Sequence, residues 1–123
     1  MNKKTELNTA NVIYQFTCPN DDYMHRSTNY IGSTTTSLSR RLTMHLANGA
    51  IKDHQLTKHN LNLTRENIVC NTVIIRKHRY PIRLLFHEAF LIKFKDSNLN
   101  RLETGNSRNL QLYSENFPVH NSN

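Results

Sequence analysis

Apolar and polar positions along the chain predict a small sheet with helices packed against it. Residues 12–16 are β-branched and aromatic, which predicts a strand with every second side chain, starting at Val12, on one face. Residues 17–29 are polar and are expected to form a loop. Residues 29–32 then predict a short second strand that ends at a glycine.

A helical repeat follows the second strand. Leu38, Leu42 and Leu46 recur every four residues, so they form one apolar stripe on a helix. Residues 35–37 are Thr, Thr and Ser, which are residue types that cap helix N-termini. The helix is expected to end near Gly49.

The second half of the chain predicts three further elements. A weaker helix is expected from Thr64, and residues 73–76 predict a buried strand. Pro81 opens the strongest helix, over about residues 82–95. A loop is expected at residues 98–100, and residues 101–113 show no clear pattern.

The predicted order is strand, strand, helix, helix, strand, helix. This order is typical of an α+β fold in which a three-stranded antiparallel sheet is flanked by helices. A single domain is expected over residues 11–113. The polar ends, residues 1–10 and 114–123, are expected to be flexible.

Composition favours a polyanionic partner. The 123 residues include 16 Lys and Arg against 9 Asp and Glu, a formal charge of +7, and neutralising phosphates releases counterions. No apolar run approaches the ~20 residues that span a bilayer, and residues 1–4 precede no apolar signal core. Cys18 and Cys70 form no disulfide framework, which indicates a reducing intracellular compartment.

The last helix carries an acidic residue in an unexpected place. At about 100° per residue, Glu88 falls in the middle of the arc formed by Leu84, Leu85, Leu91 and Ile92. An ionised carboxylate buried there must be paired, protonated or bound to a cation. One interpretation is a structural salt bridge to an arginine. The other is a metal ligand or a catalytic acid–base.

Four further residues are candidates for chemistry. Arg41 and His45 lie one helical turn apart on the flank of the leucine stripe, where the helix is expected to meet the sheet. Tyr14 and Tyr30 each fall in a predicted strand, a position typical of a core tyrosine with its hydroxyl at the edge. Taken singly, each of the four is typical of a structural role.

Taken together, these residues resemble the GIY-YIG endonuclease family. Val12-Ile13-Tyr14 is similar to the first motif, and Tyr30-Ile31-Gly32 to the second. Arg41 and His45 then follow in the order and spacing of that family. The resemblance covers roughly residues 11–101.

Two further family positions lie near the C-terminal end of this region. Glu88 resembles the metal-binding glutamate, and Asn100 resembles the terminal asparagine, with Asn98 as a competitor. The first motif departs from the family because Val12 stands in place of its glycine. This substitution changes the local turn but leaves the side chain of Tyr14 in place.

The resemblance implies a DNA endonuclease that uses one Mg²⁺ or Mn²⁺ ion held by Glu88. Arg41 would stabilise the phosphate, and His45 would shuttle a proton. Tyr14 would act as general base and Tyr30 would orient the water, although these two roles can be exchanged. Asn100 would anchor the site through hydrogen bonds.

Within the family, the chain looks most like the nuclease domain of Penelope-like retroelements. That likeness implies a DNA-nicking domain that acts in the nucleus and is fused to, or associated with, a reverse transcriptase. Such domains carry two cysteines before the second motif, whereas here Cys18 has no partner there. A zinc site from Cys18, His45 and His54 lacks a fourth ligand, so structural zinc is not expected.

Basic residues other than these site residues are expected to bind the DNA substrate. They would contact backbone phosphates without reading bases. These candidates are Arg40, Lys52, Lys58, Arg76, Lys77 and Arg79. No base-stacking platform is evident from the sequence. Two alternatives stay open: a binding module of the same fold without turnover, and a basic RNA-binding domain in which Glu88 forms a structural salt bridge.

Overall fold

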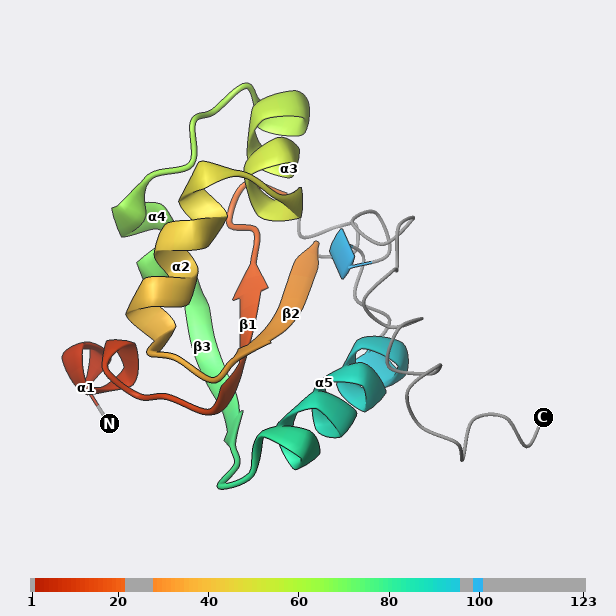
Figure 1. The fold of residues 1–123 in the computed structure, drawn as a ribbon. Helices are drawn as coiled ribbons and strands as arrows, with labels where there is room; N and C mark the ends of the chain where they lie inside the picture. Colours follow the sequence, from red (N-terminus) through yellow and green to blue (C-terminus); the bar gives the residue numbers. More distant parts are fainter. Residues whose placement is uncertain (1, 22–27, 96–98, 101–123) are drawn as a thin grey trace.

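A computed structural model describes residues 2–21, 28–95 and 99–100, which form a three-stranded sheet with helices on both faces (Figure 1). The elements in chain order are α1 (Lys3–Leu7), β1 (Val12–Thr17), β2 (Asn29–Thr34), α2 (Leu38–Ala47), α3 (Ala50–His59), α4 (Arg65–Cys70), β3 (Thr72–Lys77) and α5 (Pro81–Lys95). None of the helices in these residues is both long and apolar enough to cross a membrane.

β1 is the central strand, with β2 and β3 paired antiparallel on either side. In the β1–β2 ladder Tyr14 lies opposite Gly32, and Ile13 lies opposite Ser33. The β1–β3 register shifts between Ile13 and Tyr14. The predicted α+β fold with a three-stranded antiparallel sheet is therefore confirmed.

The two faces of the sheet support two separate cores, because successive strand side chains point to opposite faces. Val12, Tyr14 and Phe16 are buried with residues of α2, α3 and α4. The other face packs on α5, and its core consists of Ile13, Ile31, Leu84 and Leu91. Since β1 is covered on both faces, its apolar residues run without the alternation of a half-exposed strand.

The helix starts follow the capping residues in the sequence. Ser37 Oγ accepts a hydrogen bond from the backbone N–H of Arg40 at the start of α2, at 3.2 Å. Thr64 Oγ1 accepts one from the N–H of Asn67 at the start of α4, at 3.1 Å. Both helices therefore begin where the sequence predicts.

Three elements differ from the prediction. Residues 3–7 form helix α1, where the polar pattern indicated no regular structure. Helix α3 was not predicted, because two of its buried residues are the polar His54 and Gln55. Leu99 and Asn100 are helical rather than part of a loop. Asn98 and residues 101–123 lie outside the described residues.

Candidate functional site

Tyr14, His45 and Arg41 meet on the face of the sheet that α2 covers. The Tyr14 hydroxyl lies 2.6 Å from His45 Nε2, and Arg41 Nε–H donates to the same hydroxyl oxygen at 3.2 Å. Arg41 and His45 share one side of α2, since they are four residues apart. The phenol oxygen is thus held between a ring nitrogen and a guanidinium group.

Tyr30 completes an aromatic cluster around this hydroxyl. Its ring centroid lies 5.1 Å from that of His45, edge to face, and 6.5 Å from that of Tyr14. Gly32 allows this packing because the Tyr14 side chain lies directly over it. A Cβ at Gly32 would overlap both the hydroxyl and the adjoining ring carbon of Tyr14.

His45 is held in its neutral form. Burial lowers its pKa, the positive charge of Arg41 lowers it further, and the resulting pKa is about 3. At neutral pH its ring therefore carries one proton and offers one nitrogen as an acceptor. With Nε2 unprotonated, the Tyr14 hydroxyl donates to His45 while it accepts from Arg41.

A surface pocket adjoins this group at the C-terminal end of α2. It has a volume of about 240 Å³ and is lined by Arg41, Met44, His45, Ala47, Asn48 and Gly49. Helix α3 begins at Ala50, directly after the last of these residues. The partial positive charge at the N-terminus of α3 is opposed by the partial negative charge at the C-terminus of α2, so Arg41 supplies the positive charge of the pocket.

Glu88 lies on the other face of the sheet. It is half-buried on α5, where Leu84 and Leu91 are buried, and its Oε1 accepts a hydrogen bond from Ser33 Oγ at 2.8 Å. Ser33 pairs with Ile13, whose side chain packs on α5. The carboxylate is therefore not enclosed among leucines, as the helical arc suggested, but lies beside the hydroxyl of an edge strand.

Asn100 attaches to the same edge strand. Its Oδ1 accepts from the N–H of Ile31 and its Nδ2 donates to the carbonyl oxygen of Ile31, both at 2.7 Å. The side chain is buried. Asn100 thus pairs with β2 as a neighbouring strand would, and it fixes the segment between Tyr30 and Gly32.

The structure brings Tyr14, Tyr30, Arg41 and His45 into one cluster. Glu88 and Asn100 reach β2 separately, at Ser33 and Ile31. The predicted DNA-contacting residues come from two parts of the chain. Arg40, Lys52 and Lys58 lie on α2 and α3, whereas Arg76, Lys77 and Arg79 lie at the end of β3 and in the following turn. All are exposed except Lys52, which is half-buried and donates to the carbonyl oxygen of Ala47.

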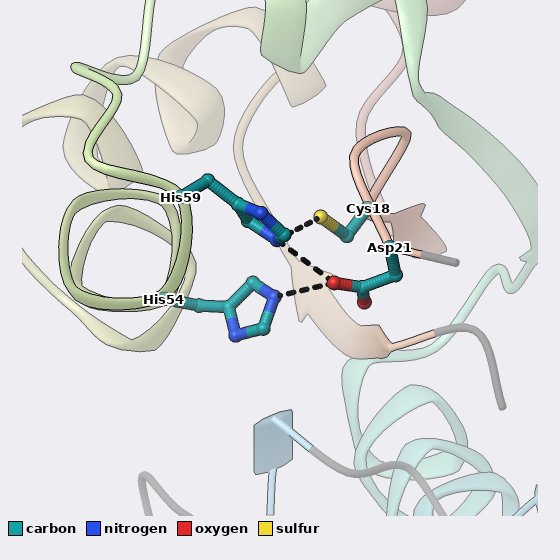
Figure 2. A group of neighbouring side chains, drawn as sticks. All are labelled: Cys18, Asp21, His54 and His59. Atoms are coloured by element: carbon teal, nitrogen blue, oxygen red, sulfur yellow. Dashed lines mark hydrogen bonds and ion pairs between the residues drawn. The ribbon is translucent and has the colours of Figure 1, made fainter. Parts of the chain in front are cut away.

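A second cluster, Cys18, Asp21, His54 and His59, could hold a metal ion (Figure 2). One donor atom from each residue lies within 4.8 Å of the others. Asp21 Oδ1 is 2.8 Å from His59 Nε2 and 3.2 Å from His54 Nε2, and Cys18 Sγ is 3.5 Å from His59 Nε2. The cluster joins the segment after β1 to helix α3.

The surroundings of this cluster favour an ionised carboxylate. Burial raises the pKa of Asp21, but hydrogen bonds from Thr28, His59 and His54 outweigh it and hold that pKa at about 2. Burial raises the pKa of the Cys18 thiol. Gln55 Nε2 donates to Cys18 Sγ at 3.0 Å, so the sulfur already has a supporting hydrogen bond from α3.

Two of these four residues were missed from the sequence. The sequence offered only Cys18, His45 and His54 for a zinc site, so structural zinc was not expected. In the structure His45 lies against Tyr14, and the third and fourth donors come from Asp21 and His59. The sequence signal that could have revealed this metal site is a Cys-x₂-Asp motif together with a His-x₄-His motif. Cysteine-based spacing rules overlook a carboxylate in the place of the second cysteine.

Both sites are described from the residues of this chain, without support from a related protein. We compared the chain with models of protein families, with curated proteins and with solved structures. It matches none of them.

Proposed function

We propose that this domain is a DNA endonuclease that depends on a divalent metal ion. The observation that carries the proposal is the Tyr14 hydroxyl held between neutral His45 and cationic Arg41. A buried phenol with a proton acceptor on one side and a positive charge on the other is suited to general-base chemistry. Such an arrangement is not needed for packing, since a phenylalanine would fill the same space.

The geometry supports a route for the proton. A free phenol has a pKa near 10 and is a weak base at neutral pH. As the water oxygen attacks phosphorus, Tyr14 Oη takes a proton from the water and passes its own proton to His45 Nε2, while Arg41 stabilises the negative charge on the phenol oxygen. Because burial and Arg41 make His45 a weak base, His45 does not keep this proton but gives it to the leaving oxygen as the phosphodiester P–O bond breaks.

The pocket beside Arg41 and His45 supports the binding of the phosphate itself. About 240 Å³ accommodates a phosphate group with adjoining sugar atoms. Arg41 presents a planar guanidinium to the anion, and the pocket lies directly before the N-terminus of α3. The guanidinium would stabilise the negative charge that develops in the transition state.

Glu88 is the residue we propose as the ligand of one Mg²⁺ or Mn²⁺ ion. Its carboxylate and the hydroxyl of Ser33 are oxygen donors, which suit a hard divalent cation. Ser33 follows Gly32, against which Tyr14 lies, so the carboxylate and the phenol approach neighbouring residues of one edge strand from opposite faces. An ion held by Glu88 would supply positive charge to a phosphate bound at this edge of β2.

Plasmid nicking tests this proposal. Supercoiled plasmid is incubated with Mg²⁺ or Mn²⁺ and wild type, Tyr14→Phe or Glu88→Gln. We expect Tyr14→Phe to lower the rate by about 10²-fold or more, because only the hydroxyl is lost. Glu88→Gln should remove the response to metal concentration. Tyr80→Phe is the matched control, since Tyr80 is exposed and lies outside the cluster.

Equal nicking by wild type, Tyr14→Phe and Glu88→Gln would show a contaminating nuclease and would refute the proposal. The alternative is a nucleic-acid-binding module without turnover. The position of Glu88 on the face opposite Tyr14 favours this alternative. It predicts DNA binding that depends on salt, as the charge of +7 requires, and no nicking at any metal concentration.

The resemblance to Penelope-like retroelement nucleases supports a more specific role. In that role the domain would nick chromosomal DNA in the nucleus. The nick would serve a reverse transcriptase fused to it or associated with it.

For the second cluster, we propose that the ion is Zn²⁺. One sulfur, two imidazole nitrogens and one carboxylate oxygen form a four-donor set, which suits tetrahedral zinc with no position left for a substrate. Such a closed site is structural. The measurement is metal content of the purified protein, where we expect one zinc per chain and its loss in Cys18→Ser. A metal-free protein of unchanged stability would refute zinc.

A further inference from the structure

Helix α5 carries a row of large apolar side chains that the sheet does not cover. Ile82, Phe86, Phe90 and Phe94 recur every four residues and are 48%, 44%, 60% and 74% exposed. This amount of apolar surface along one helix is unusual, because isolated exposed residues are common but contiguous patches are not. The row therefore calls for a functional explanation.

The row points away from the sheet. At about 100° per residue from Ile82, Phe86, Phe90 and Phe94 fall at about 40°, 80° and 120°. Leu84 and Leu91, which are buried against the sheet, fall at about 200° and 180°. In Figure 1, α5 lies on the side of the sheet opposite α2.

The same arc is positively charged. Arg83 and Lys93 are exposed and fall at about 100° and 20°, within the arc that runs from Ile82 to Phe94. The single acidic residue of α5, Glu88, falls at about 240° and contacts Ser33. Three more exposed cations, Arg76, Lys77 and Arg79, lie just before the helix.

Phe90 and Phe94 stack on each other, so each ring leaves its outer face for another flat ring. Phe90 and Phe94 are nearly parallel, with an interplanar angle of 12° and ring centroids 5.6 Å apart. We refer to Phe86, Phe90, Phe94, Arg83 and Lys93 as the α5 aromatic face. An apolar protein partner would have to leave Arg83 and Lys93 without counter-charges. A polyanion with exposed flat rings satisfies both the charges and the phenylalanines.

We infer that the α5 aromatic face binds single-stranded nucleic acid. Unpaired bases stack on Phe90 and Phe94, and the backbone phosphates contact Arg83 and Lys93. A duplex fits less well, because its bases are already stacked inside the helix. This surface provides the base-stacking platform that the sequence did not reveal. The inference does not rest on hydrolysis, so it holds whether or not the domain cuts DNA.

Fluorescence anisotropy tests the inference with a labelled oligo(dT) of about 12 nucleotides and a duplex of the same length. Mg²⁺ and Mn²⁺ are omitted, so binding is measured without cleavage. We expect wild type to prefer the single strand. Replacing both rings, Phe90→Leu with Phe94→Leu, keeps the surface apolar but removes the stacking faces. It should weaken single-strand binding by about tenfold or more and leave duplex binding unchanged.

Further variants separate stacking from other contacts. Phe90→Tyr with Phe94→Tyr keeps the rings and should bind like wild type. Arg83→Ala or Lys93→Ala should each lower the salt slope of single-strand binding by about 0.7. Leu56→Ala, an exposed apolar residue of α3, is the matched control and should change nothing.

Two outcomes would overturn the inference. One is undiminished single-strand binding by the leucine pair. The other is a wild-type dimer in sedimentation velocity that Phe90→Ser with Phe94→Ser converts to monomers, because the face would then join two copies of the chain. Neither outcome bears on plasmid nicking, so the two proposals fail independently.

Discussion

At the scale of single residues, Gly32 and His45 decide what Tyr14 can do. Gly32 leaves room for the phenol to lie across β2. His45 presents a ring nitrogen to the hydroxyl at 2.6 Å and stays neutral because burial and Arg41 lower its pKa to about 3. A neutral, buried histidine beside a phenol is a costly arrangement in acid, and this cost can be measured.

The lowered pKa of His45 predicts a loss of stability in acid. In the unfolded chain His45 has its ordinary pKa of 6.5, so between pH 6.5 and about 3 the unfolded state binds a proton that the folded state does not. Stability is therefore fully present above pH 6.5 and falls as the pH drops, by at most about 1.4 kcal/mol per pH unit. His87, whose pKa is lowered by burial and then by His78 and Arg76, acts in the same direction.

Urea unfolding between pH 6.5 and 4.5 measures this effect. His45→Gln should show a flatter dependence on pH than wild type, because the remaining carboxyl groups and His87 are common to both proteins. Parallel curves for the two proteins would mean that His45 ionises as freely in the folded state as in the unfolded chain.

At the scale of elements, the strands and most helices follow the local pattern of the sequence. β1, β2, α2, α4, β3 and α5 all form where periodicity and capping residues predict them. Helix α3 escaped prediction because its buried positions include His54 and Gln55, which contact Asp21 and Cys18 rather than an apolar core. A helix whose buried face includes polar side chains lacks the apolar periodicity by which an amphipathic helix is recognised in a sequence.

The edge of β2 depends on Asn100 in place of a further strand. Asn100→Ala leaves the N–H and the carbonyl of Ile31 without these two hydrogen bonds, which should cost about 1–3 kcal/mol. Asn100→Asp keeps the acceptor and loses the donor. Its loss in free energy of unfolding should therefore differ from that of Asn100→Ala. Chemical denaturation gives both values, and the exposed Asn62→Ala serves as control. An unchanged midpoint in Asn100→Ala would show that this contact does not stabilise the edge.

At the scale of the whole molecule, the Cys18–Asp21–His54–His59 cluster joins the end of the central strand to α3. If it holds zinc, chelation should lower the melting temperature, because the ion binds the folded state only. His59→Ala should melt near the temperature of the chelated wild type and should not respond to chelator. Equal melting temperatures with and without chelator would indicate that hydrogen bonds alone join the two segments.

The sequence by itself determined the elements of the sheet, the charge of the molecule and the residues worth testing, because periodicity, capping and composition are local properties. The proximity of Tyr14, Tyr30, Arg41 and His45 was expected only through a family resemblance. Other features were decided by the tertiary structure: the face of the sheet that Glu88 occupies, the meeting of Asp21 with His54 and His59, and the outward direction of Phe90 and Phe94. Each depends on strand register and on how helices pack against the sheet, and these are set by contacts between segments far apart in the chain.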